Sequence, residues 1–392
     1  MKILYISSSN AKGGGTLALY NIIRGMMERG HEVLVAVTQD AGPLPDMLDA
    51  IGCPHVTVRT RLSCYPVHQD WTLPARIAWM RLNNMLARRR LRRIMQQFRP
   101  DLVHTNVGPL DVGYDVSHSL GIPHVWHQRE YQDLDFDLHF YPDVETFMRK
   151  SHAADNYNIC ITRGVFQHRQ FRENRDRVIY DGVFGEQQAQ HAAALLQQQP
   201  SASEDYVLFV GRIEEAKGAR QLLQVFGAFH RRYPHCRLKL VGRYKNDAYY
   251  MACRQTVAEA GLADAVDFLG ECSDVYALMA GARMLVVPSR FEGFGFITAE
   301  AMLCGCPVVG RDTAGTREQF DIGLAYAGAE IGLRFADDAG MLKAMCRVME
   351  EDMTAMCQRA RQTVLSHYSL QQHVMQVEDY YRFVLQQMAE QS

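Results

Sequence analysis

The chain has 392 residues, which favours at least two domains, each large enough to build its own hydrophobic core. The 42 Lys and Arg residues nearly balance the 44 Asp and Glu residues, so no strong net charge selects a nucleic acid as a partner. The 10 cysteines form no C-x2-C pair, which favours reduced, mostly buried thiols. The apolar start of the chain is too short for a secretory signal, and no apolar run reaches spanning length, so we expect a cytoplasmic protein unless it adheres to a membrane face.

The first half of the chain alternates apolar strands with helix-length segments. The first strand leads into three glycines, Gly13 to Gly15, and a helix is predicted from about Thr16 to Arg29. Strands that alternate with helices in this way predict a parallel sheet covered on both faces. The predicted strands of this half are 2–9, 31–38, 101–106 and 124–127.

The segment from Arg76 to Arg99 carries eight arginines and no acidic residue. Leu91, Ile94 and Phe98 recur at helical spacing, so part of the segment is predicted to be an amphipathic helix whose other face is basic. Two interpretations stay open. The basic face is either solvated, with the helix packed on the sheet, or it adsorbs to anionic lipid and makes the protein peripheral on the cytoplasmic face of the membrane.

The sequence D-L-D-F-D at Asp133, Asp135 and Asp137 offers oxygen ligands at a spacing that suits Mg²⁺ or Mn²⁺ in principle. A metal-binding D-x-D motif, however, is expected to end a buried apolar strand, and here the motif follows the polar residues H-Q-R-E-Y-Q. We therefore predict an exposed loop and no metal site.

A polar, Gln-rich segment that contains Pro200 separates the two halves of the chain. This composition predicts a linker, with helical turns around Ala192. The segment at the C-terminus is predicted to be mostly helical and to cross back onto the N-terminal domain. The predicted division is an N-terminal domain at 1–185, a linker at 186–205, a C-terminal domain at 206–367 and the returning helix at 368–392.

The second half repeats the alternation of strands and helices, so a second parallel sheet is predicted. The ligand of such sheets is expected at the carboxyl ends of the strands, in a crevice between the two domains. The predicted strands are 206–212, 237–243, 266–270, 283–289 and 307–312.

The twelve residues from Ser289 to Glu300, S-R-F-E-G-F-G-F-I-T-A-E, place two carboxylates, Glu292 and Glu300, around a glycine loop. Gly293 and Gly295 let the backbone approach a ligand closely, and the first N–H groups of the helix that follows have no helical partners. Such a loop suits an anion or a sugar hydroxyl. The two carboxylates can contact different parts of one elongated ligand, for which a nucleotide-sugar is suited.

Several motifs resemble those of the retaining glycosyltransferases of GT-B fold, family 4, which carry an E-x7-E motif. The resemblance is dense from about Val207 to Glu318. It implies an α/β protein with two Rossmann-like domains whose parallel sheets face a central cleft. The motifs are G-R-I-E-E-A-K-G at 211–218, P-S-R-F-E-G-F-G at 288–295, E-A-M-L-C-G-C-P-V-V at 300–309 and A-G-T-R-E at 314–318.

By this resemblance Arg212 and Lys217 supply the positive charge that meets the donor diphosphate. Glu300 accepts hydrogen bonds from the ribose, and Glu292 lies near the transferred sugar. The alternatives stay open: the two cations pair with neighbouring acids at the surface, and Glu300 stands where the helix dipole favours it. Glu292 has no local partner in the sequence. The backbone of Gly293, Phe294, Gly295 and Phe296 is expected to reach sugar and phosphate oxygens, while the two Phe rings pack.

In the first half, Gly14 and Gly15 resemble the family's loop that approaches the donor phosphate, and His127 matches its histidine beside the transferred sugar. Arg129 and Glu130 are acceptor candidates that alternatively pair with each other, and His104 occupies a similar strand end. The sequence departs from the family's usual motif at Asp181-Gly182, because an Asn commonly precedes this Gly.

The resemblance implies transfer of a sugar, with retention, from a nucleoside-diphosphate donor to a hydroxyl of a glycan or lipid-linked acceptor in polysaccharide or glycoconjugate biosynthesis. A UDP-sugar is the first expectation for the donor and a GDP-sugar the second. No cofactor and no obligatory metal are expected. Two other functions stay open: a sugar-nucleotide epimerase, which needs no acceptor, and a catalytically silent nucleotide-sugar-binding protein.

Overall fold

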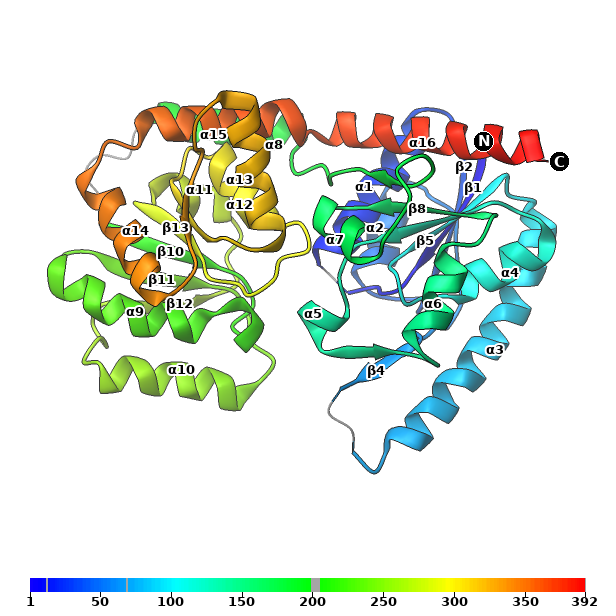
Figure 1. Cartoon of the computed structure of the whole chain (residues 1–392), viewed down its shortest axis with the longest axis horizontal. Coiled ribbons are helices and arrows are strands. Elements are labelled where there is room, and N and C mark those ends of the chain that lie inside the picture. The colour runs from blue at the N-terminus through cyan, green and yellow to red at the C-terminus, as the bar shows by residue number, and fades with distance from the viewer. Residues whose placement is uncertain (12, 68–69, 199–204, 392) are drawn as a thin grey trace. The chain divides into compact units, whose positions relative to one another are not determined.

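The chain folds into two compact units (Figure 1). The computed structural model describes residues 1–11, 13–67, 70–198 and 205–391. Unit 1 comprises Met1–Gly182 and Leu370–Ser392, and unit 2 comprises Val183–Ser369. Each unit has its own sheet and its own apolar core. Of the described helices, none combines the length and apolarity needed to cross a bilayer.

Unit 1 is built on a parallel sheet of seven strands in the order β3-β2-β1-β5-β6-β8-β9. The four strands predicted for this half are confirmed. Because β1 pairs with both β2 and β5, the chain runs outward in opposite directions from this central pair. The strands are β1 (Lys2–Ser7), β2 (Glu32–Val37), β3 (His55–Thr57), β5 (Leu102–Asn106), β6 (His124–Gln128), β8 (Asn156–Cys160) and β9 (Arg177–Val178).

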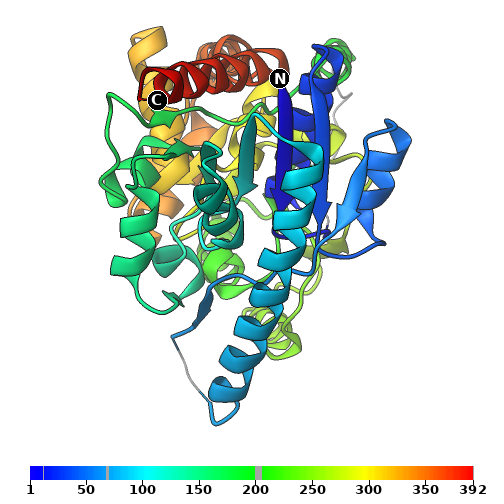
Figure 2. The same ribbon diagram turned by 90° about the vertical axis from the view of Figure 1, so that its right-hand side faces the viewer.

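Helices cover both faces of this sheet, and an antiparallel pair of short strands, β4 (Cys64–Pro66) and β7 (Leu138–Phe140), lies outside it. One core contains Ile22 of α1 (Gly14–Glu28) and Tyr381 of α16 (Leu370–Gln391). The other contains Leu91 of α3 (Leu73–Phe98) and Val116 of α4 (Val112–Leu120). Figure 2 shows the long α3 running along the unit. The helices are α1 (Gly14–Glu28), α2 (Pro43–Ala50), α3 (Leu73–Phe98), α4 (Val112–Leu120), α5 (Asp133–Phe136), α6 (Val144–Ser151), α7 (Arg163–His168) and α16 (Leu370–Gln391).

The last helix, α16, is part of the core of unit 1 although it lies at the end of the chain. It packs against α1, where Gly25 leaves room for Val374: a Cβ on that glycine would lie 2.5 Å from a Val374 methyl group. Glu378 of α16 also pairs with Arg29, and its carboxylate lies 2.9 Å from His31 Nε2. Burial and charge pairing therefore hold this helix on unit 1.

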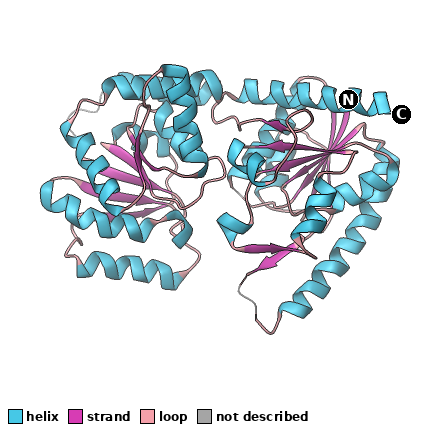
Figure 3. Ribbon diagram, viewed as in Figure 1, coloured by secondary structure: helices cyan, strands magenta, loops and turns pink. Residues whose placement is uncertain are grey.

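Unit 2 contains a parallel sheet of six strands in the order β12-β11-β10-β13-β14-β15 (Figure 3). The five strands predicted for this half are confirmed. The strands are β10 (Tyr206–Val210), β11 (Arg237–Val241), β12 (Val266–Gly270), β13 (Met284–Val287), β14 (Val308–Arg311) and β15 (Leu333–Phe335). The helices are α8 (Glu186–Gln197), α9 (Ala219–Arg232), α10 (Asp247–Glu259), α11 (Val275–Gly281), α12 (Phe296–Leu303), α13 (Ala314–Ala327), α14 (Asp338–Glu350) and α15 (Thr354–His367).

The helical turns predicted around Ala192 are confirmed: within the predicted linker at 186–205, helix α8 (Glu186–Gln197) forms. Ala192 is buried, and α8 packs on α11. His191 Nε2 lies 3.1 Å from Asp274, and its ring stacks on Tyr276. The segment stays polar because a helix that buries one small residue needs few apolar side chains. Residues 199–204 lie outside the described residues.

Candidate active site

The carboxyl ends of β10 and β13 are the place where the sheet of unit 2 is expected to bind a ligand. The chain order runs outward in both directions from this pair of strands, and ligands of open α/β sheets bind at such a switch point. The backbones that follow the strands approach one another closely. A Cβ on Gly242, which has φ +139°, would lie 2.0 Å from the Gly211 carbonyl oxygen, and one on Gly218 would lie 2.6 Å from the Pro288 oxygen.

Lys217 and Glu292 form an ion pair at this switch point. Lys217 Nζ lies 2.8 Å and 2.9 Å from the two carboxylate oxygens of Glu292, and Ser289 Oγ donates to Oε1 at 2.7 Å. The expectation that Glu292 has no local partner is therefore wrong, because Ser289 stands three residues before it. The two side chains of the pair are 22% and 13% exposed, so the charges are screened from bulk water but remain accessible. Such a pair can exchange one partner for a ligand.

Arg212 behaves differently from Lys217. It pairs with Glu214 at 2.9 Å, and both side chains are about a third exposed. The interpretation as a surface ion pair thus holds for Arg212 and is wrong for Lys217. Glu215, the other neighbouring acid, is bound by Arg290 at 3.0 Å. A partly exposed arginine keeps donors that remain available to a diphosphate.

The glycine loop before α12 is held in shape by residues of α13. Gly295 adopts φ +86° at the N-cap, and Gln319 Nε2 donates to the carbonyl oxygens of Phe294 and Gly295 at 2.6 Å and 3.1 Å. Gly315 N donates to the Glu292 carbonyl oxygen at 2.9 Å, and a Cβ on Gly315 would lie 2.3 Å from the Phe294 oxygen. The predicted site did not include Gln319 and Gly315. Gly315 could have been found from the sequence, because it is the glycine of the A-G-T-R-E motif.

Glu300 lies in the second turn of α12, one turn deeper than the position that the helix dipole favours most. Its carboxylate has neither an ion-pair nor a hydrogen-bond partner among the described residues. Desolvation by burial raises the pKa of Glu300 to about 7. Glu300 is nevertheless only partly buried, so its carboxyl group can be reached by a ligand. A carboxyl group with a shifted pKa and no protein partner marks a candidate functional group. It can accept hydrogen bonds from hydroxyl groups.

The two phenylalanines of the loop pack against protein. Phe294 is buried, with its ring centroid 5.4 Å from that of Phe296 and 5.3 Å from that of Tyr368. Gly293 precedes Phe294 in the same loop and is partly buried.

In unit 1 the corresponding switch point lies between β1 and β5. Helix α1 begins at Gly14, directly after the N-cap residue Gly13, without a capping side chain or an acidic residue in its first turn. Asn106, at the end of β5, donates to the Gly15 carbonyl oxygen at 3.2 Å. A Cβ on Gly15 would lie 3.4 Å from the Arg129 side chain, so this glycine belongs to the same polar cluster as Arg129.

His127 and His104 are both fully buried at the strand ends, with ring centroids 5.3 Å apart. Arg129 Nη2 donates to His127 Nδ1 at 3.3 Å. Because a guanidinium only donates, the Nδ1 atom accepts and the proton of the neutral ring sits on Nε2. His104 Nδ1 lies 2.7 Å from the hydroxyl of Tyr381 on α16. Burial, and then the charge of Arg129, hold the pKa of both histidines well below its usual value.

Arg129 and Asp181 form a buried ion pair, 4% and 1% exposed. Arg129 Nη1 donates to both carboxylate oxygens at 2.8 Å and 2.7 Å, and its Nε donates to Asn106 at 2.5 Å. The alternative that Arg129 pairs with Glu130 is wrong, since the Glu130 carboxylate accepts from Gln132 at 3.0 Å. A buried arginine requires a charged partner, which gives a physical reason for Asp at position 181.

Beside this ion pair, His373 of α16 lies 3.8 Å from Asp181 and 2.7 Å from the Tyr180 carbonyl oxygen. Sequence reasoning missed the roles of Asn106, His373 and Tyr381. The sequence contained one indication of this buried cluster, which is the Asp at position 181 where the family commonly has Asn.

The D-L-D-F-D segment is largely exposed, as expected, but it forms the short helix α5 and not a loop. Asp135 accepts from the backbone N–H groups of Tyr131 and Gln132 at 2.9 Å and 2.6 Å. Asp133 pairs with His168 and Arg169. Within the described ranges, no three potential ligands cluster in a way that would hold a metal ion.

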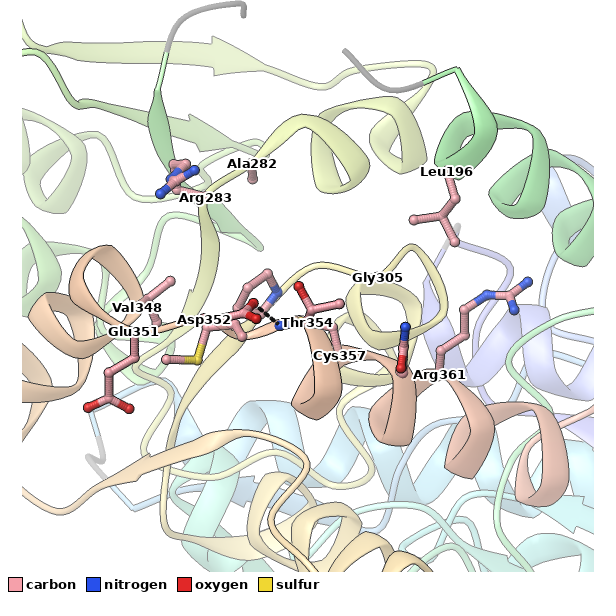
Figure 4. Close-up of a pocket in the computed structure, with 13 residues that line it drawn as sticks. Leu196, Ala282, Arg283, Gly305, Val348, Glu351, Asp352, Thr354, Cys357 and Arg361 are labelled. Atoms are coloured by element: carbon pink, nitrogen blue, oxygen red, sulfur yellow. Dashed lines mark hydrogen bonds between the residues drawn. The ribbon is translucent and has the colours of Figure 1, made fainter. Parts of the chain in front are cut away.

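A cavity of about 800 Å³ in unit 2 lies away from these residues (Figure 4). Arg283 precedes β13 and Pro307 precedes β14, so the cavity opens at the amino ends of the strands, opposite the switch point. Cys357 and Arg361 of α15 line another side. None of the predicted site residues lines this cavity.

Comparison with known proteins gives two family models that together span most of the chain. The model for glycosyl transferases group 1 matches residues 204–351, and the model for the glycosyl transferase 4-like domain matches residues 13–178. The chain is 27% identical to N-acetyl-alpha-D-glucosaminyl L-malate synthase of Bacillus anthracis over 187 residues, which are 47% of either protein.

Two further proteins are informative. The lipopolysaccharide core biosynthesis mannosyltransferase LpsB of Rhizobium meliloti is 38% identical over 98 residues, 25% of this chain and 26% of that protein. The sequence matches thus span less than half of the length of these relatives. The crystal structure of Anabaena Alr3699/HepE in complex with UDP superposes with a TM-score of 0.76 and 21% identity, covering 97% of this chain and 100% of that one.

Proposed function

Because the chain belongs to the glycosyl transferases of group 1 and has the GT-B fold, we propose that it transfers a sugar from a nucleoside-diphosphate donor to a hydroxyl group. The observation that carries this proposal is the juxtaposition of Lys217 with Glu292 at the switch point of unit 2, where the helix that follows the Glu292 loop carries Glu300, a carboxyl group without a partner among the described residues. In the proposed reaction the bond from the anomeric carbon to the diphosphate oxygen breaks and a bond to the acceptor oxygen forms. The acceptor proton leaves with the diphosphate.

Each residue of unit 2 has a proposed task in this reaction. Glu300 accepts hydrogen bonds from the ribose hydroxyls, and the backbone N–H groups at the start of α12 bind sugar and phosphate oxygens. Lys217 and Arg212 meet the negative charge that grows on the departing diphosphate. Glu292 holds Lys217 in place and lies near the positive charge that develops on the sugar.

The proposed roles in unit 1 follow from the family resemblance. Gly14 and Gly15 approach the donor phosphate with their backbone, and His127 donates a hydrogen bond from Nε2 to a hydroxyl of the transferred sugar. This donor role suits a ring whose pKa is lowered, because the histidine stays neutral at physiological pH. Arg129 and His104 support His127 from within the buried cluster, so of the three acceptor candidates only Glu130 keeps that role. We further propose retention at the anomeric carbon and no requirement for a metal.

A UDP-sugar is the first donor to test, because the similar Alr3699/HepE was crystallised with UDP. The acceptor is proposed to be a glycan or a lipid-linked glycan of polysaccharide biosynthesis, in keeping with the mannosyltransferase relative, which is named for lipopolysaccharide core biosynthesis. A lipid-linked acceptor favours a protein that works on the cytoplasmic face of a membrane.

The test has two stages. A thermal-shift panel of UDP-, GDP- and ADP-sugars first identifies the nucleotide, with Glu300→Ala as the control that removes the proposed ribose contact. The preferred donor is then incubated with the protein and candidate acceptors, and the products are analysed by NMR. Transfer or slow donor hydrolysis with an unchanged anomeric configuration supports the proposal. An inverted ring carbon would indicate an epimerase, and binding without any reaction would indicate a silent binding protein.

A further inference from the structure

Helix α3 (Leu73–Phe98) presents apolar residues on two opposite faces. One face is buried in unit 1 through Met80, Ala87, Leu91 and Met95. On the opposite face, at the same helical spacing, the side chains of Trp79, Leu82 and Leu86 are 51%, 52% and 51% exposed. A helix that packs on a sheet needs only one apolar face. Packing within unit 1 therefore does not explain the second apolar face.

The exposed face changes from apolar to basic along the helix. Arg89, Arg90 and Arg93 continue the line of Trp79, Leu82 and Leu86 toward the end of α3, and all three are exposed. They have no ion-pair partner among the residues that the structure describes, and α3 itself contains no Asp or Glu. By contrast Arg88, on the side of the helix, pairs with Asp111 and Asp115. The outward face therefore carries positive charge that is not neutralised by an ion pair within the described residues.

The loop before α3 extends the apolar surface. Trp71 is 92% exposed, and Val67 is exposed as well. The guanidinium of Arg61 lies 4.1 Å from the ring centroid of Trp79. Figure 2 shows the start of α3 and strand β4 reaching away from the sheet of unit 1. A groove of about 220 Å³ adjoins these residues and is lined by Leu62, Tyr65, Pro66, Ile77 and Met80, among others.

We propose that this end of unit 1 inserts into a lipid surface. Its apolar part, named here the α3 tip and consisting of Val67, Trp71, Trp79, Leu82 and Leu86, enters the interface, while the three arginines farther along meet anionic headgroups. Trp and aliphatic side chains beside a row of basic residues match a surface that is anionic outside and apolar beneath. A second copy of the chain is a poorer occupant, because two such faces would bring their arginines together, and the exposed acid of the same loop, Asp70, already pairs with Arg76.

This inference deepens the membrane contact in the proposed function. The predicted amphipathic helix is confirmed, because Leu91, Ile94 and Phe98 pack in unit 1 while Arg89, Arg90 and Arg93 are exposed. The structure adds an apolar tip on the same exposed face as these arginines, which was not predicted from the sequence. It does not depend on the donor chemistry, so vesicle binding and transfer to a water-soluble acceptor test the two proposals separately.

The experiment measures sedimentation of the full chain with vesicles that contain phosphatidylcholine alone or with added phosphatidylglycerol. We expect the wild type to bind the anionic vesicles and to bind neutral ones much more weakly. Arg89, Arg90 and Arg93 changed together to Glu should lower the partition coefficient by roughly a hundredfold or more, because each basic residue near an anionic surface contributes about fivefold. Trp71, Trp79 and Leu82 changed together to Ser should abolish binding at every salt concentration.

Fluorescence reports insertion directly. Of the chain's 3 tryptophans, Trp126 is buried and the other two lie in the tip, so the wild-type emission should shift to the blue on anionic vesicles and be quenched by brominated lipid chains. Matched controls in unit 2 are Met251→Ser with Leu324→Ser, and Arg231, Arg254 and Lys343 changed together to Glu, all exposed positions. These controls should bind vesicles like the wild type.

Three results would overturn the proposal: no binding of the wild type to anionic vesicles, binding without a blue shift, or binding by the Ser variant of the tip equal to that of the wild type. Self-association that the Ser variant abolishes, in a wild type that ignores vesicles, would assign the tip to a second copy. Unchanged transfer to a small soluble acceptor by the Ser variant shows that it is folded and that the donor site is intact.

Discussion

Each sheet carries an ion pair between a basic and an acidic side chain near its switch point, but the pair is partly exposed in unit 2 and buried in unit 1. In unit 2, Lys217 and Glu292 are paired but partly exposed, and Glu300 has no partner among the described residues. In unit 1, Arg129 and Asp181 are almost completely buried, and each is bound by other side chains of the same unit. A charge that keeps some contact with solvent can exchange a protein partner for a ligand. A buried charge must be paired before any ligand arrives, so the unit 1 cluster supports the site and does not bind by exchange.

The two regions also differ in how their titratable groups are shifted. Burial raises the pKa of Glu300 to about 7 and lowers the pKa of His104 and His127 well below its usual value. Desolvation is the first cause in all three, and it favours the neutral form of an acid and of a base alike. The consequences for stability therefore have opposite signs in the two units.

The largest expected effect is on the buried pair of unit 1. Asp181→Ala leaves Arg129 charged and unpaired, so the free energy of unfolding of this unit should fall by about 3 to 5 kcal/mol. Urea titration followed by tryptophan emission measures this, because Trp71, Trp79 and Trp126 all lie in unit 1. Asp181→Asn, which keeps an acceptor, should lose less than Asp181→Ala. A loss below about 1 kcal/mol for Asp181→Ala would mean that water reaches the pair and that it is not a structural support.

For the exchangeable pair of unit 2, we expect an effect on turnover and little effect on folding. Lys217→Ala or Arg212→Ala removes a cation that meets the charge of the transition state, and a hundredfold loss of turnover would correspond to about 2.7 kcal/mol. Steady-state kinetics with the identified donor should show kcat reduced more than donor affinity. Arg290→Ala, which breaks the exposed pair with Glu215, is the matched control and should leave kcat unchanged. Equal losses in all three variants would contradict the assignment.

Glu300 should control nucleotide affinity. In Glu300→Ala the free nucleotide and the sugar donor should both bind roughly ten- to a hundredfold more weakly, since a hydrogen bond to a charged acceptor is worth about 1.5 kcal/mol or more. Because the ionised carboxylate is the acceptor, wild-type affinity should rise from pH 6 to pH 8 through the pKa of about 7. Calorimetry across this range tests both points, with Glu300→Gln expected to show no such rise. Unchanged affinity of the Ala variant would exclude the ribose contact.

The opposite pKa shifts predict opposite dependences of stability on pH. His104 and His127 are neutral in the folded state while the unfolded state takes up protons below its ordinary histidine pKa, near 6.5, so unit 1 should lose stability as the pH falls below that value. Glu300 holds its proton up to about pH 7 in the folded state, whereas the unfolded state releases it above about pH 4.5. The free energy of unfolding of unit 2 should therefore fall as the pH rises from about 4.5 to 7.

Hydrogen exchange of β6 and of α12 reads these two pH dependences separately. In Glu300→Gln, the loss of protection of α12 at rising pH should disappear, and the loss of protection of β6 at falling pH should remain. If both elements weakened in the same direction with pH, burial could not be the dominant cause of the shifts.

The smallest expected effect is that of metal removal. Because Lys217 and Arg212 can carry the charge of the diphosphate, transfer should be unchanged in EDTA. Asp133→Asn, which weakens the contacts to His168 and Arg169, should likewise leave kcat unchanged. Activity lost in EDTA and restored by Mn²⁺ would return Asp133, Asp135 and Asp137 to consideration as metal ligands.

Local patterns in the sequence were sufficient for most of the sheet framework. Apolar runs of four to six residues predicted the central strands of both sheets, because a parallel strand covered on both faces must be apolar on both. The strand β8 escaped prediction because its sequence, N-Y-N-I-C, alternates polar residues. Its asparagines are buried and satisfied over long distances in the sequence, with Asn158 bonded to Asp176 and to the Ser151 carbonyl oxygen. No local signal distinguishes such a strand from a loop.

The sequence by itself also determined which residues of unit 2 belong together, because the motifs around Lys217, Glu292 and Glu300 follow strand ends that a parallel sheet brings to one edge. Only the tertiary structure decided the partners. Lys217 pairs with Glu292, which is 75 residues away, and not with the adjacent acids. The His104 ring contacts the Tyr381 hydroxyl, which is 277 residues away. The tertiary structure also decided that Trp79, Leu82 and Leu86 of α3 stay exposed. Ion pairing and burial depend on distances between elements remote in the chain, and a local periodicity carries no information about those distances.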